Sequence, residues 1–255
     1  MPDDSARSFY DALAADYDLL FADWDASISR QGRALDRLLV RQLGDARRGV
    51  LDCACGIGTQ AIGLGAHGHR VVGSDLSTAA VTRARAEASQ RRIEVPVLAA
   101  DMRRLPFSSG SFEVVLCADN AIAHLLTETS LAAALHEMRR VLAPGGLLVL
   151  TVRSDHARDT HPAHTPPQVT DTHAGRVITF QLWDWHADGE HYDMQHIQLH
   201  PRGGTYEVRV RRTSSWALRQ EQLSSLVLAA GFLDLCWHLP DASGFPQPVL
   251  TARRT

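Results

Sequence analysis

The chain has 255 residues, of which 45% are apolar and 22% charged, as is usual for a globular protein with a substantial core. A formal net charge of -3 disfavours nucleic acid and anionic membrane surfaces as partners. The longest apolar runs are too short to span a bilayer, and the acidic start, Met1–Asp4, does not resemble a signal peptide.

Cysteine and lysine usage restrict the chemistry further. None of the 4 cysteines belongs to a C-x-x-C pair, so free thiols and a cytoplasmic location are expected. The sequence contains no lysine, which excludes a P-loop lysine and a Schiff-base lysine. Histidines gather between 156 and 200 without a metal-ligand spacing, so no metal site is predicted.

The first 45 residues predict a helical cap. Aromatic and acidic residues alternate irregularly over 5–24, a pattern that favours one or two short helices. The aromatic side chains could either pack on the core or face a ligand. A stripe of leucines predicts a further helix over 28–43, with Gly44 as its C-cap.

From residue 49 the pattern changes to alternating strands and helices. The helices are predicted to end near 67, 90 and 142, and Ser77 is the expected N-cap of the second. Repeated strand–helix units of this length indicate a parallel sheet with right-handed crossovers. The strands are predicted at 50–53, 70–73, 95–99, 112–117 and 146–152.

The C-terminal part predicts an insertion and a return to the sheet. Residues 154–175 are rich in Pro, His and Thr and predict a mobile excursion. Three antiparallel strands follow at 176–185, 191–200 and 205–216, then a helix at 219–231 and strands at 232–237 and 249–253. The predicted fold is α/β, a doubly wound, mostly parallel seven-stranded sheet. Its main domain comprises 1–153, with the 1–45 cap, and 217–255, and 154–216 forms an inserted antiparallel lid.

The most informative motif is the glycine-containing stretch Asp52–Thr59, which leaves the first strand. Its glycines allow a tight turn and a close backbone approach to a ligand at a helix N-terminus. Asp75 ends the next strand, where a carboxylate can bind both ribose hydroxyls of an adenosine. Asp101 and Met102 follow the third strand and could bind the adenine amino group and ring. The glycine loop alone also fits a dinucleotide, or a turn that binds nothing.

Together with Leu142–Gly146 before the fifth strand, these motifs resemble the class I S-adenosylmethionine-dependent methyltransferases over 49–153 and the C-terminal helix and hairpin. Within that superfamily the chain is most similar to the glycine and sarcosine N-methyltransferases. The resemblance implies S-adenosyl-L-methionine as cofactor and S-adenosyl-L-homocysteine as product. The cofactor contacts that it implies are Tyr10, Tyr17, Trp24, Arg30, Ala54, Gly56, Asp75, Leu76, Asp101, Met102 and Ala118.

The same resemblance implies an acceptor site at the end of the fifth strand. Asn120 and Arg153 would hold the carboxylate of the acceptor, with Tyr192 as a further substrate contact and His124 as a candidate base. An arginine at the carboxyl edge of the sheet can clamp a carboxylate with two parallel hydrogen bonds. The alternatives are a surface ion pair for Arg153, a turn-stabilising side chain for Asn120 and a packing role for His124.

The predicted function is transfer of a methyl group to the amine nitrogen of a small amino acid or a related carboxylate-bearing amine, aligned in line with the S–CH3 bond. The alternatives are an O- or C-methyltransferase of a secondary metabolite, a nicotinamide-dependent oxidoreductase and a non-catalytic adenosine-ligand sensor. The expected partner is a small-molecule acceptor, with no nucleic acid and no membrane. The oligomeric state stays open, with a homodimer as one option.

Overall fold

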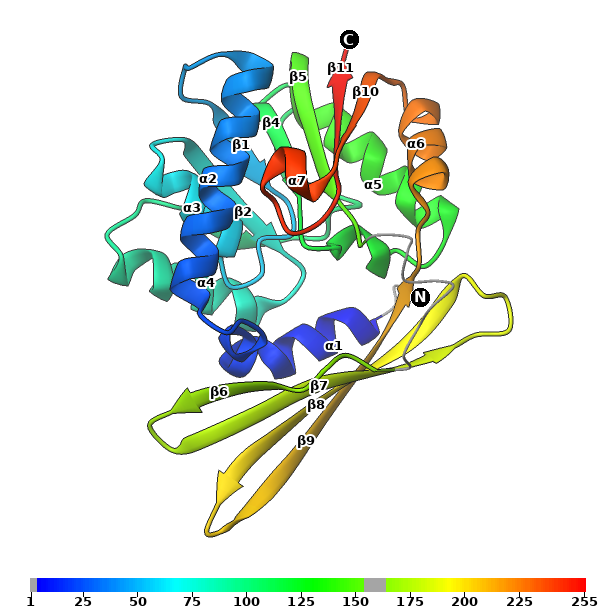
Figure 1. The fold of residues 1–255 in the computed structure, drawn as a ribbon. Helices are drawn as coiled ribbons and strands as arrows, with labels where there is room; N and C mark the ends of the chain where they lie inside the picture. The colour runs from blue at the N-terminus through cyan, green and yellow to red at the C-terminus, as the bar shows by residue number, and fades with distance from the viewer. Residues whose placement is uncertain (1–3, 154–163) are drawn as a thin grey trace.

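The computed structural model describes residues 4–153 and 164–255, which form two sheets with a helix between them (Figure 1). The larger sheet, flanked by helices, lies above α1 (Asp4–Leu13), and a smaller antiparallel sheet lies below it. No helix in the described ranges is long and apolar enough to cross a membrane.

The N-terminal cap is helical, as predicted. The 3-10 helix η1 (Ala14–Leu20) follows α1, and α2 (Trp24–Leu43) begins four residues before the start that the leucine stripe predicted. The earlier start has a clear cause, because the carboxylate of Asp23 caps the helix by accepting a hydrogen bond from the Ala26 N–H at 2.9 Å. Gly44 ends α2 with a φ of 81°, as expected for a glycine C-cap.

The larger sheet has seven strands in the order β10-β11-β5-β4-β1-β2-β3. Only β11 runs antiparallel to its neighbours, so the predicted doubly wound, mostly parallel sheet is confirmed. The order reverses on either side of β1, the place where open α/β sheets bind ligands at their carboxyl edge. The strands are β1 (Gly49–Asp52), β2 (Arg70–Asp75), β3 (Val97–Ala99), β4 (Phe112–Cys117), β5 (Leu142–Thr151), β10 (Phe232–His238) and β11 (Val249–Arg254).

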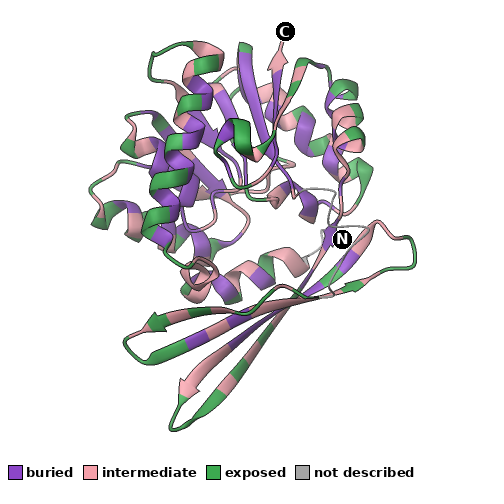
Figure 2. Cartoon of the chain, in the orientation of Figure 1, coloured by how far each residue is buried: buried purple, intermediate pink, exposed green. Residues whose placement is uncertain are grey.

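Helices cover both faces of this sheet. On one face, α2, α3 (Thr59–Ala66) and α4 (Thr78–Gln90) pack against alternate strand residues such as Val50 and Val71. On the other, α5 (Glu128–Val141) and α6 (Gln220–Ala229) pack against residues such as Leu51 and Val115. Strands buried on both sides are continuously apolar, which is why the sequence pattern identified them. Figure 2 shows the resulting buried centre.

Two local features differ from the sequence prediction. Strand β5 begins directly at Leu142 and includes Pro144 and the following glycines, whereas a start at 146 was predicted. The pairing with β4 shifts register in this stretch, so the Pro-Gly-Gly segment is an irregular strand start and not a separate loop. A short helix, α7 (Pro240–Ser243), lies between β10 and β11, with Pro240 at its first position.

The smaller sheet has four strands, in the order β6-β7-β8-β9, one more than predicted. Strand β6 (Gln168–Thr172) lies within 154–175, which the sequence analysis interpreted wholly as a mobile excursion; residues 154–163 of that segment lie outside the described residues. The interpretation was wrong for 168–172 because β6 pairs antiparallel with β7 through a tight hairpin. The other strands are β7 (Gly175–Trp185), β8 (His191–Arg202) and β9 (Thr205–Trp216). We call this four-stranded sheet the lid sheet.

The inner face of the lid sheet packs on α1 and η1. Phe9 and Leu13 of α1 form one apolar cluster with Tyr192 and Met194 of β8. Next to this cluster, Asp16 of η1 accepts hydrogen bonds from two arginines of β9, at 3.2 Å from Arg209 Nη1 and 2.8 Å from Arg211 Nη2. The lid sheet is thereby attached to the N-terminal cap by both apolar and ionic contacts.

Candidate active site

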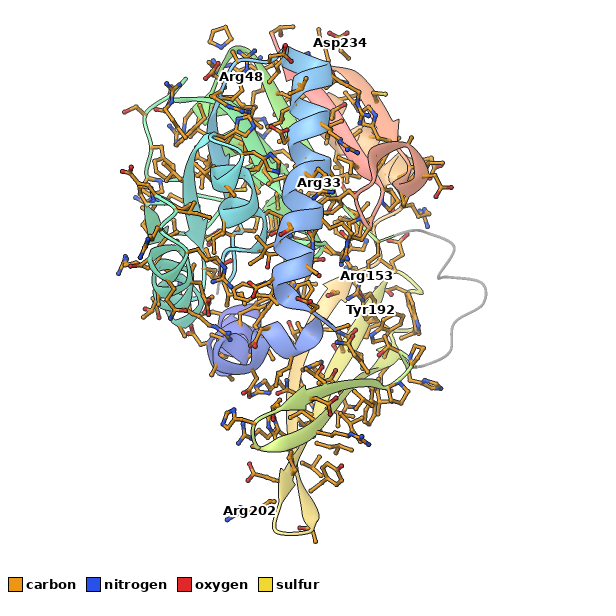
Figure 3. All side chains as sticks on the ribbon, turned by 60° about the vertical axis from the view of Figure 1, so that its left-hand side comes forward. Arg33, Arg48, Arg153, Tyr192, Arg202 and Asp234 are labelled. Carbon is orange, nitrogen blue, oxygen red and sulfur yellow. The ribbon has the colours of Figure 1, made fainter. Side chains whose placement is uncertain are left out.

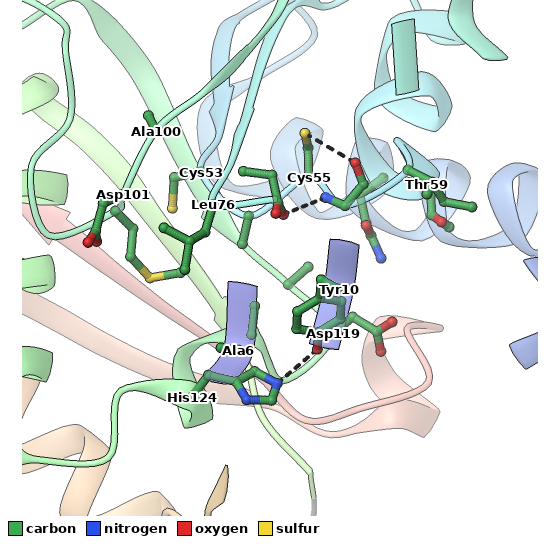
Figure 4. A pocket seen from close by; sticks show the side chains of 18 of the residues that line it. Ala6, Tyr10, Cys53, Cys55, Thr59, Leu76, Ala100, Asp101, Asp119 and His124 are labelled. Carbon is green, nitrogen blue, oxygen red and sulfur yellow. Dashed lines mark hydrogen bonds between the residues drawn. The ribbon is translucent and has the colours of Figure 1, made fainter. Parts of the chain in front are cut away.

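A pocket opens between α1 and the carboxyl ends of β1, β2 and β4 (Figure 4). The space between its walls, with the open solvent at the mouth included, is about 900 Å³. Ten of the predicted site residues line it: Tyr10, Tyr17, Ala54, Gly56, Asp75, Leu76, Asp101, Met102, Ala118 and His124.

The glycine loop between β1 and α3 forms one wall of the pocket. Gly56 and Gly58 have φ values of 53° and 101°, in the left-handed region that glycine adopts without strain. A Cβ atom at Gly58 would also approach the Ile62 side chain to 2.9 Å. The turn places the N-terminus of α3, with its unpaired backbone N–H groups, beside the pocket.

Below this loop the side chain of Asp52 is fully buried. Its Oδ1 accepts a weak hydrogen bond from the Ala54 N–H at 3.4 Å, and its Oδ2 is buried without a hydrogen-bond partner among the described residues. Burial raises the pKa of Asp52 to about 7, and the negative charge of Asp75 adds to the effect. Asp52 is therefore a buried carboxyl group that titrates near neutral pH.

Asp75 is held at the end of β2 by two backbone N–H groups. The Gly56 N–H donates to Oδ2 and the Ser77 N–H donates to Oδ1, both at 2.8 Å. Burial raises the pKa of Asp75, and these hydrogen bonds oppose that shift by stabilising the carboxylate. Each carboxylate oxygen retains a second lone pair, so the fixed group can still accept hydrogen bonds from a ribose.

Asp101 and Met102 form the opposite wall, after β3. Asp101 is bound by Arg103, whose Nη2 lies 2.6 Å from Oδ2. Burial alone would raise the pKa of Asp101, but the hydrogen bonds from Arg103 outweigh it and lower the pKa. The ionised carboxylate suits an adenine amino group, and the flexible thioether of Met102 suits the adenine ring.

Tyr10 and His124 form a hydrogen-bonded pair on the α1 side of the pocket (Figure 4). His124 Nδ1 lies 3.1 Å from the Ser214 carbonyl oxygen, which can only accept, so Nδ1 carries the proton. Nε2 then accepts from the Tyr10 hydroxyl at 2.8 Å. Burial raises the pKa of Tyr10, so this hydroxyl stays protonated and keeps donating to His124. This arrangement links α1 to β9 of the lid sheet.

Trp24 and Arg30 do not line the pocket, although both were predicted as cofactor contacts. Trp24 is the first residue of α2, and its buried indole N–H donates to Thr59 Oγ1 at 2.8 Å. It thereby supports a residue that does line the pocket. Arg30 lies on the exposed side of α2, where its Nη2 donates to Ser27 Oγ at 3.1 Å. Trp24 therefore lies behind the pocket wall, whereas Arg30 lies on the exposed side of α2.

At the other end of the pocket, β4 leads into two consecutive left-handed residues. Asp119 and Asn120 have φ values of 55° and 64°, which are uncommon for residues other than glycine. Asp119 lines the pocket, and its carboxylate accepts a hydrogen bond from Gln247 Nε2 at 3.0 Å. Burial raises the pKa of Asp119, while the positive charge of Arg153 opposes that shift. The sequence analysis assigned Asp119 no role of its own, because nothing in the sequence indicated its unusual backbone.

Arg153 follows β5 and lies where the lid sheet meets the larger domain, close to Tyr192 in the view of Figure 3. Its guanidinium lies 5.4 Å from the centre of the Trp183 ring, a cation–π contact with the lid sheet. Asn120 Oδ1 accepts the Arg153 backbone N–H at 3.0 Å. The Nη1 atom of Arg153 is buried and has no hydrogen-bond partner among the described residues. A buried cationic donor in this state is suited to an anionic ligand.

Tyr192 belongs to an aromatic cluster on the inner face of the lid sheet. Its ring centroid lies 5.7 Å from that of Trp183 and 5.1 Å from that of Trp185. The structure therefore brings Asn120, Arg153 and the Tyr192 cluster to one seam between the two sheets. None of the three lines the pocket beside Asp75, so they lie beyond its lid-side end.

Comparisons with known proteins agree with this geometry. Residues 50–146 match the family described as "Methyltransferase domain". A demethylmenaquinone methyltransferase of Beutenbergia cavernae is 40% identical over 58% of this chain, and a glycine/sarcosine N-methyltransferase of Parasynechococcus marenigrum is 35% identical over 52%. The chain spans only 58% and 46% of the lengths of these relatives.

A solved structure extends the likeness to nearly the whole fold. An amino pentose methyltransferase from Micromonospora echinaspora, with S-adenosylmethionine bound, has a TM-score of 0.75 and 22% identity, covering 90% of this chain and 92% of its own. At that identity the likeness concerns the fold.

Residues 50–146 thus resemble a methyltransferase domain, and the fold of the chain resembles that of an S-adenosylmethionine-dependent methyltransferase. The cofactor is S-adenosylmethionine, as predicted from the motifs. The narrower likeness to glycine and sarcosine N-methyltransferases is one among several.

Proposed function

We propose that this chain is a methyltransferase that methylates the amine nitrogen of a small amino acid or a related carboxylate-bearing amine. The observation that carries the proposal is the buried Nη1 of Arg153, which has no partner in the described chain. An unpaired buried guanidinium N–H costs free energy, and a bound carboxylate would remove that cost with strong hydrogen bonds.

Asp119 supplies the complementary charge. It lines the cofactor pocket, whereas Arg153 lies towards the lid sheet, and the positive charge of Arg153 opposes the burial that raises the pKa of Asp119. A zwitterionic acceptor has one group for each of them, because its ammonium can donate to Asp119 while its carboxylate accepts from Arg153. This pairing orients the nitrogen towards the cofactor and the carboxylate away from it.

The residues of this chain bind the acceptor, orient it and exclude water around it. S-adenosylmethionine, when bound, supplies an activated methyl group on a sulfonium sulfur. Asp119 accepts a proton from the acceptor ammonium, which frees the nitrogen lone pair for attack. The N–C bond forms as the S–C bond breaks, and the electron pair of that bond remains on sulfur. The α1 helix and the lid sheet exclude water from the site.

Under this proposal His124 is a positioning residue. In the tautomer that the Ser214 carbonyl requires, its Nδ1 donates and its Nε2 accepts from Tyr10, so both ring nitrogens are engaged. A direct role as base would require the Tyr10 hydrogen bond to break. We assign to His124 the task of holding Tyr10 over the pocket.

A second candidate acceptor is an amino sugar, favoured by Asp119 rather than by Arg153. An amino sugar has an ammonium for Asp119 but no carboxylate for the buried guanidinium. The structurally similar protein from Micromonospora echinaspora is an amino pentose methyltransferase. The aromatic cluster around Tyr192 offers flat surfaces on which a sugar ring could pack.

The test is to incubate the chain with methyl-labelled S-adenosylmethionine and three acceptor sets: amino acids, amino sugars, and hydroxylated aromatics. Label on an amino-acid nitrogen, located by mass spectrometry, supports the first candidate. Label only on amino sugars would replace it with the second. Label only on oxygen or carbon, or none while S-adenosylhomocysteine still binds, would contradict the proposal of N-methylation.

A further inference from the structure

Three residues at the acceptor end of the pocket form a closed hydrogen-bonded network. They are Asp119 after β4, Thr151 at the end of β5 and Gln247 just before β11, and these strands are neighbours in the larger sheet. The Asp119 N–H donates to Thr151 Oγ1 at 2.8 Å, and Thr151 Oγ1 donates to Gln247 Oε1 at 2.7 Å. Gln247 Nε2 closes the network by donating to Asp119 Oδ1 at 3.0 Å. Of the three residues, Asp119 alone lines the pocket.

The Thr151 hydroxyl determines how the Gln247 amide is oriented. A hydroxyl has one proton to donate, and the amide oxygen of Gln247 receives it. An amide turned by half a rotation would place Oε1 against the Asp119 carboxylate, where two acceptors would meet with no proton between them. The network therefore selects the orientation in which Gln247 presents an N–H to Asp119.

The backbone around Gln247 is stiff, so the network is held in place from outside the pocket. Gln247 lies between Pro246 and Pro248, and a residue that precedes proline is restricted to extended backbone. Phe245 is buried in the core on the α2 side of the sheet, and the Pro248 carbonyl accepts the Val152 N–H at 3.4 Å. The segment is thereby fixed both to the core and to the end of β5.

The network engages one oxygen of the Asp119 carboxylate and leaves the other for a ligand. Oδ1 accepts from Gln247, and no hydrogen bond within the described ranges engages Oδ2. The donor is a neutral amide, which orients the carboxylate without cancelling its charge as a directly paired arginine would. Burial raises the pKa of Asp119, and the Gln247 hydrogen bond opposes that shift, so it favours the ionised form. The carboxylate is thus oriented before an acceptor binds.

The same network accounts for the unusual backbone after β4. A left-handed conformation is unfavourable for residues other than glycine and persists only where the surrounding structure holds it. At Asp119, with a φ of 55°, the backbone N–H is held by Thr151. At Asn120, with a φ of 64°, the side chain is held by the Arg153 N–H. Strain of this kind is concentrated at ligand-binding sites, which agrees with the place of Asp119 in the pocket.

We propose that Gln247, held by Thr151, is the positioning residue that directs Asp119 Oδ2 at the amine of the acceptor. The inference rests on the proposed function, in which Asp119 receives the proton of the acceptor ammonium. Gln247 does not line the pocket, so it acts only through Asp119. A displacement of a reacting group by about 1 Å can lower a rate about 100-fold, so Gln247 should affect kcat more than ligand binding.

The test compares Gln247→Ala and Gln247→Glu with wild type, using the amino acid that the acceptor panel shows to be methylated fastest. Both variants lack the N–H donor, so kcat is expected to fall about 10- to 100-fold. The dissociation constant of S-adenosylhomocysteine, which also reports folding, should change less than about twofold. Gln90→Glu adds the same charge at the exposed end of α4, away from the pocket, and should behave as wild type. Thr151→Val should resemble Gln247→Ala, whereas Thr151→Ser, which keeps the hydroxyl, should retain activity.

The pH profile separates positioning of Asp119 from a general structural effect. Activity requires the ionised carboxylate, and loss of the Gln247 hydrogen bond should raise the pKa of Asp119. The acid limb of kcat/KM should therefore move to higher pH, further in Gln247→Glu, where a second carboxylate disfavours ionisation. The other groups that interact electrostatically with Asp119 are Arg153, Tyr10 and Tyr17, which the variants leave in place. The same shift should be seen without acceptor, in a ¹³C NMR titration of the Asp119 carboxyl with S-adenosylhomocysteine bound.

Asp119→Asn distinguishes failure of this inference from failure of the proposed function. Asp119→Asn is expected to slow N-methylation at least about 100-fold. If it does, but both Gln247 variants keep the wild-type kcat and the wild-type titration of Asp119, the inference is overturned while the proposed function stands. If Asp119→Asn methylates at the wild-type rate, or if no amine in the panel is methylated, the proposed function fails and the inference fails with it.

Discussion

The two sheets of this chain bury their side chains in different ways. In the larger sheet, helices cover both faces, and the residues that line the pocket stand at the carboxyl ends of its central strands. The lid sheet covers α1 with one face only and leaves apolar residues of its other face, such as Val208, exposed. The larger sheet is therefore packed on both sides, whereas the lid sheet is packed on one.

The proposed cofactor contacts and the proposed acceptor contacts lie in different parts of this fold. Proposed cofactor contacts such as Asp75 are fixed by backbone N–H groups within the larger domain. The proposed acceptor contacts lie at the seam, where Arg153 of the larger domain meets Trp183 of the lid sheet. Substitutions on the two sides should therefore affect different constants, which makes the comparison testable.

The largest effect is expected at Arg153. Arg153→Lys keeps the charge but loses the planar fork, so acceptor kcat/KM should fall almost as far as in Arg153→Ala, by about 30-fold to several thousand-fold. The dissociation constant of S-adenosylhomocysteine, measured by calorimetry, should barely change. Arg33→Lys, on the exposed side of α2, is the matched control (Figure 3). Unchanged acceptor kinetics in both Arg153 variants would make Arg153 a structural residue and remove the support for a carboxylate-bearing acceptor.

The reverse pattern is expected at Asp75. Asp75→Ala should weaken binding of S-adenosylhomocysteine by about 1–3 kcal/mol, since charge-assisted hydrogen bonds to the ribose are lost. Asp241→Asn, an exposed acid in α7, serves as the control in the same calorimetric titration. An Asp75 variant that binds with wild-type affinity would show that the ribose lies elsewhere.

The contact between cap and lid sheet should be weaker but measurable. Asp16→Asn removes the charge that Arg209 and Arg211 share, and we expect the free energy of unfolding to fall by about 1–2 kcal/mol, equivalent to a few degrees in Tm. Asp171→Asn breaks a fully exposed ion pair in the same sheet and should have no measurable effect. Equal Tm values for the two variants would mean that the ionic attachment of the lid sheet contributes nothing.

A pH dependence of stability is expected from Asp52. Burial raises its pKa in the folded chain to about 7, whereas an unfolded aspartate titrates near about 3.9. The folded state thus holds the proton more tightly, so this contribution to stability is greatest at low pH and is lost as pH rises from about 4 to about 7. The Tm of Asp52→Asn relative to wild type should accordingly increase between about pH 5 and about pH 8. A Tm difference that does not vary with pH would mean that Asp52 is already ionised when buried.

The sequence predicted the larger sheet well because its signals are local. Buried parallel strands are continuously apolar, and Asp75 stands at a strand end that can be read from the chain. The lid sheet was less predictable. Strand β6 is a short strand in a polar, Pro-rich stretch, and its pairing with β7 is not visible in its composition.

The acceptor end depended on contacts that no local pattern encodes. The role of Asp119 arises from a left-handed backbone and from Gln247, which is distant in sequence. The displacement of Trp24 and Arg30 from the pocket follows from how α2 turns its faces, which a motif match does not specify. The exposed outer face of the lid sheet could not be predicted either, because alternation identifies both faces of a strand but not the face that remains uncovered.

The division between cofactor and acceptor regions is tested most directly by hydrogen exchange with and without ligands. S-adenosylhomocysteine alone should slow exchange over 50–120 and in α1, because these segments line the pocket. Adding the acceptor with the highest turnover should then slow exchange over 175–216 and around Arg153, as the lid sheet closes on it. Protection of the lid sheet that is complete with S-adenosylhomocysteine alone, or absent with both ligands, would contradict the account.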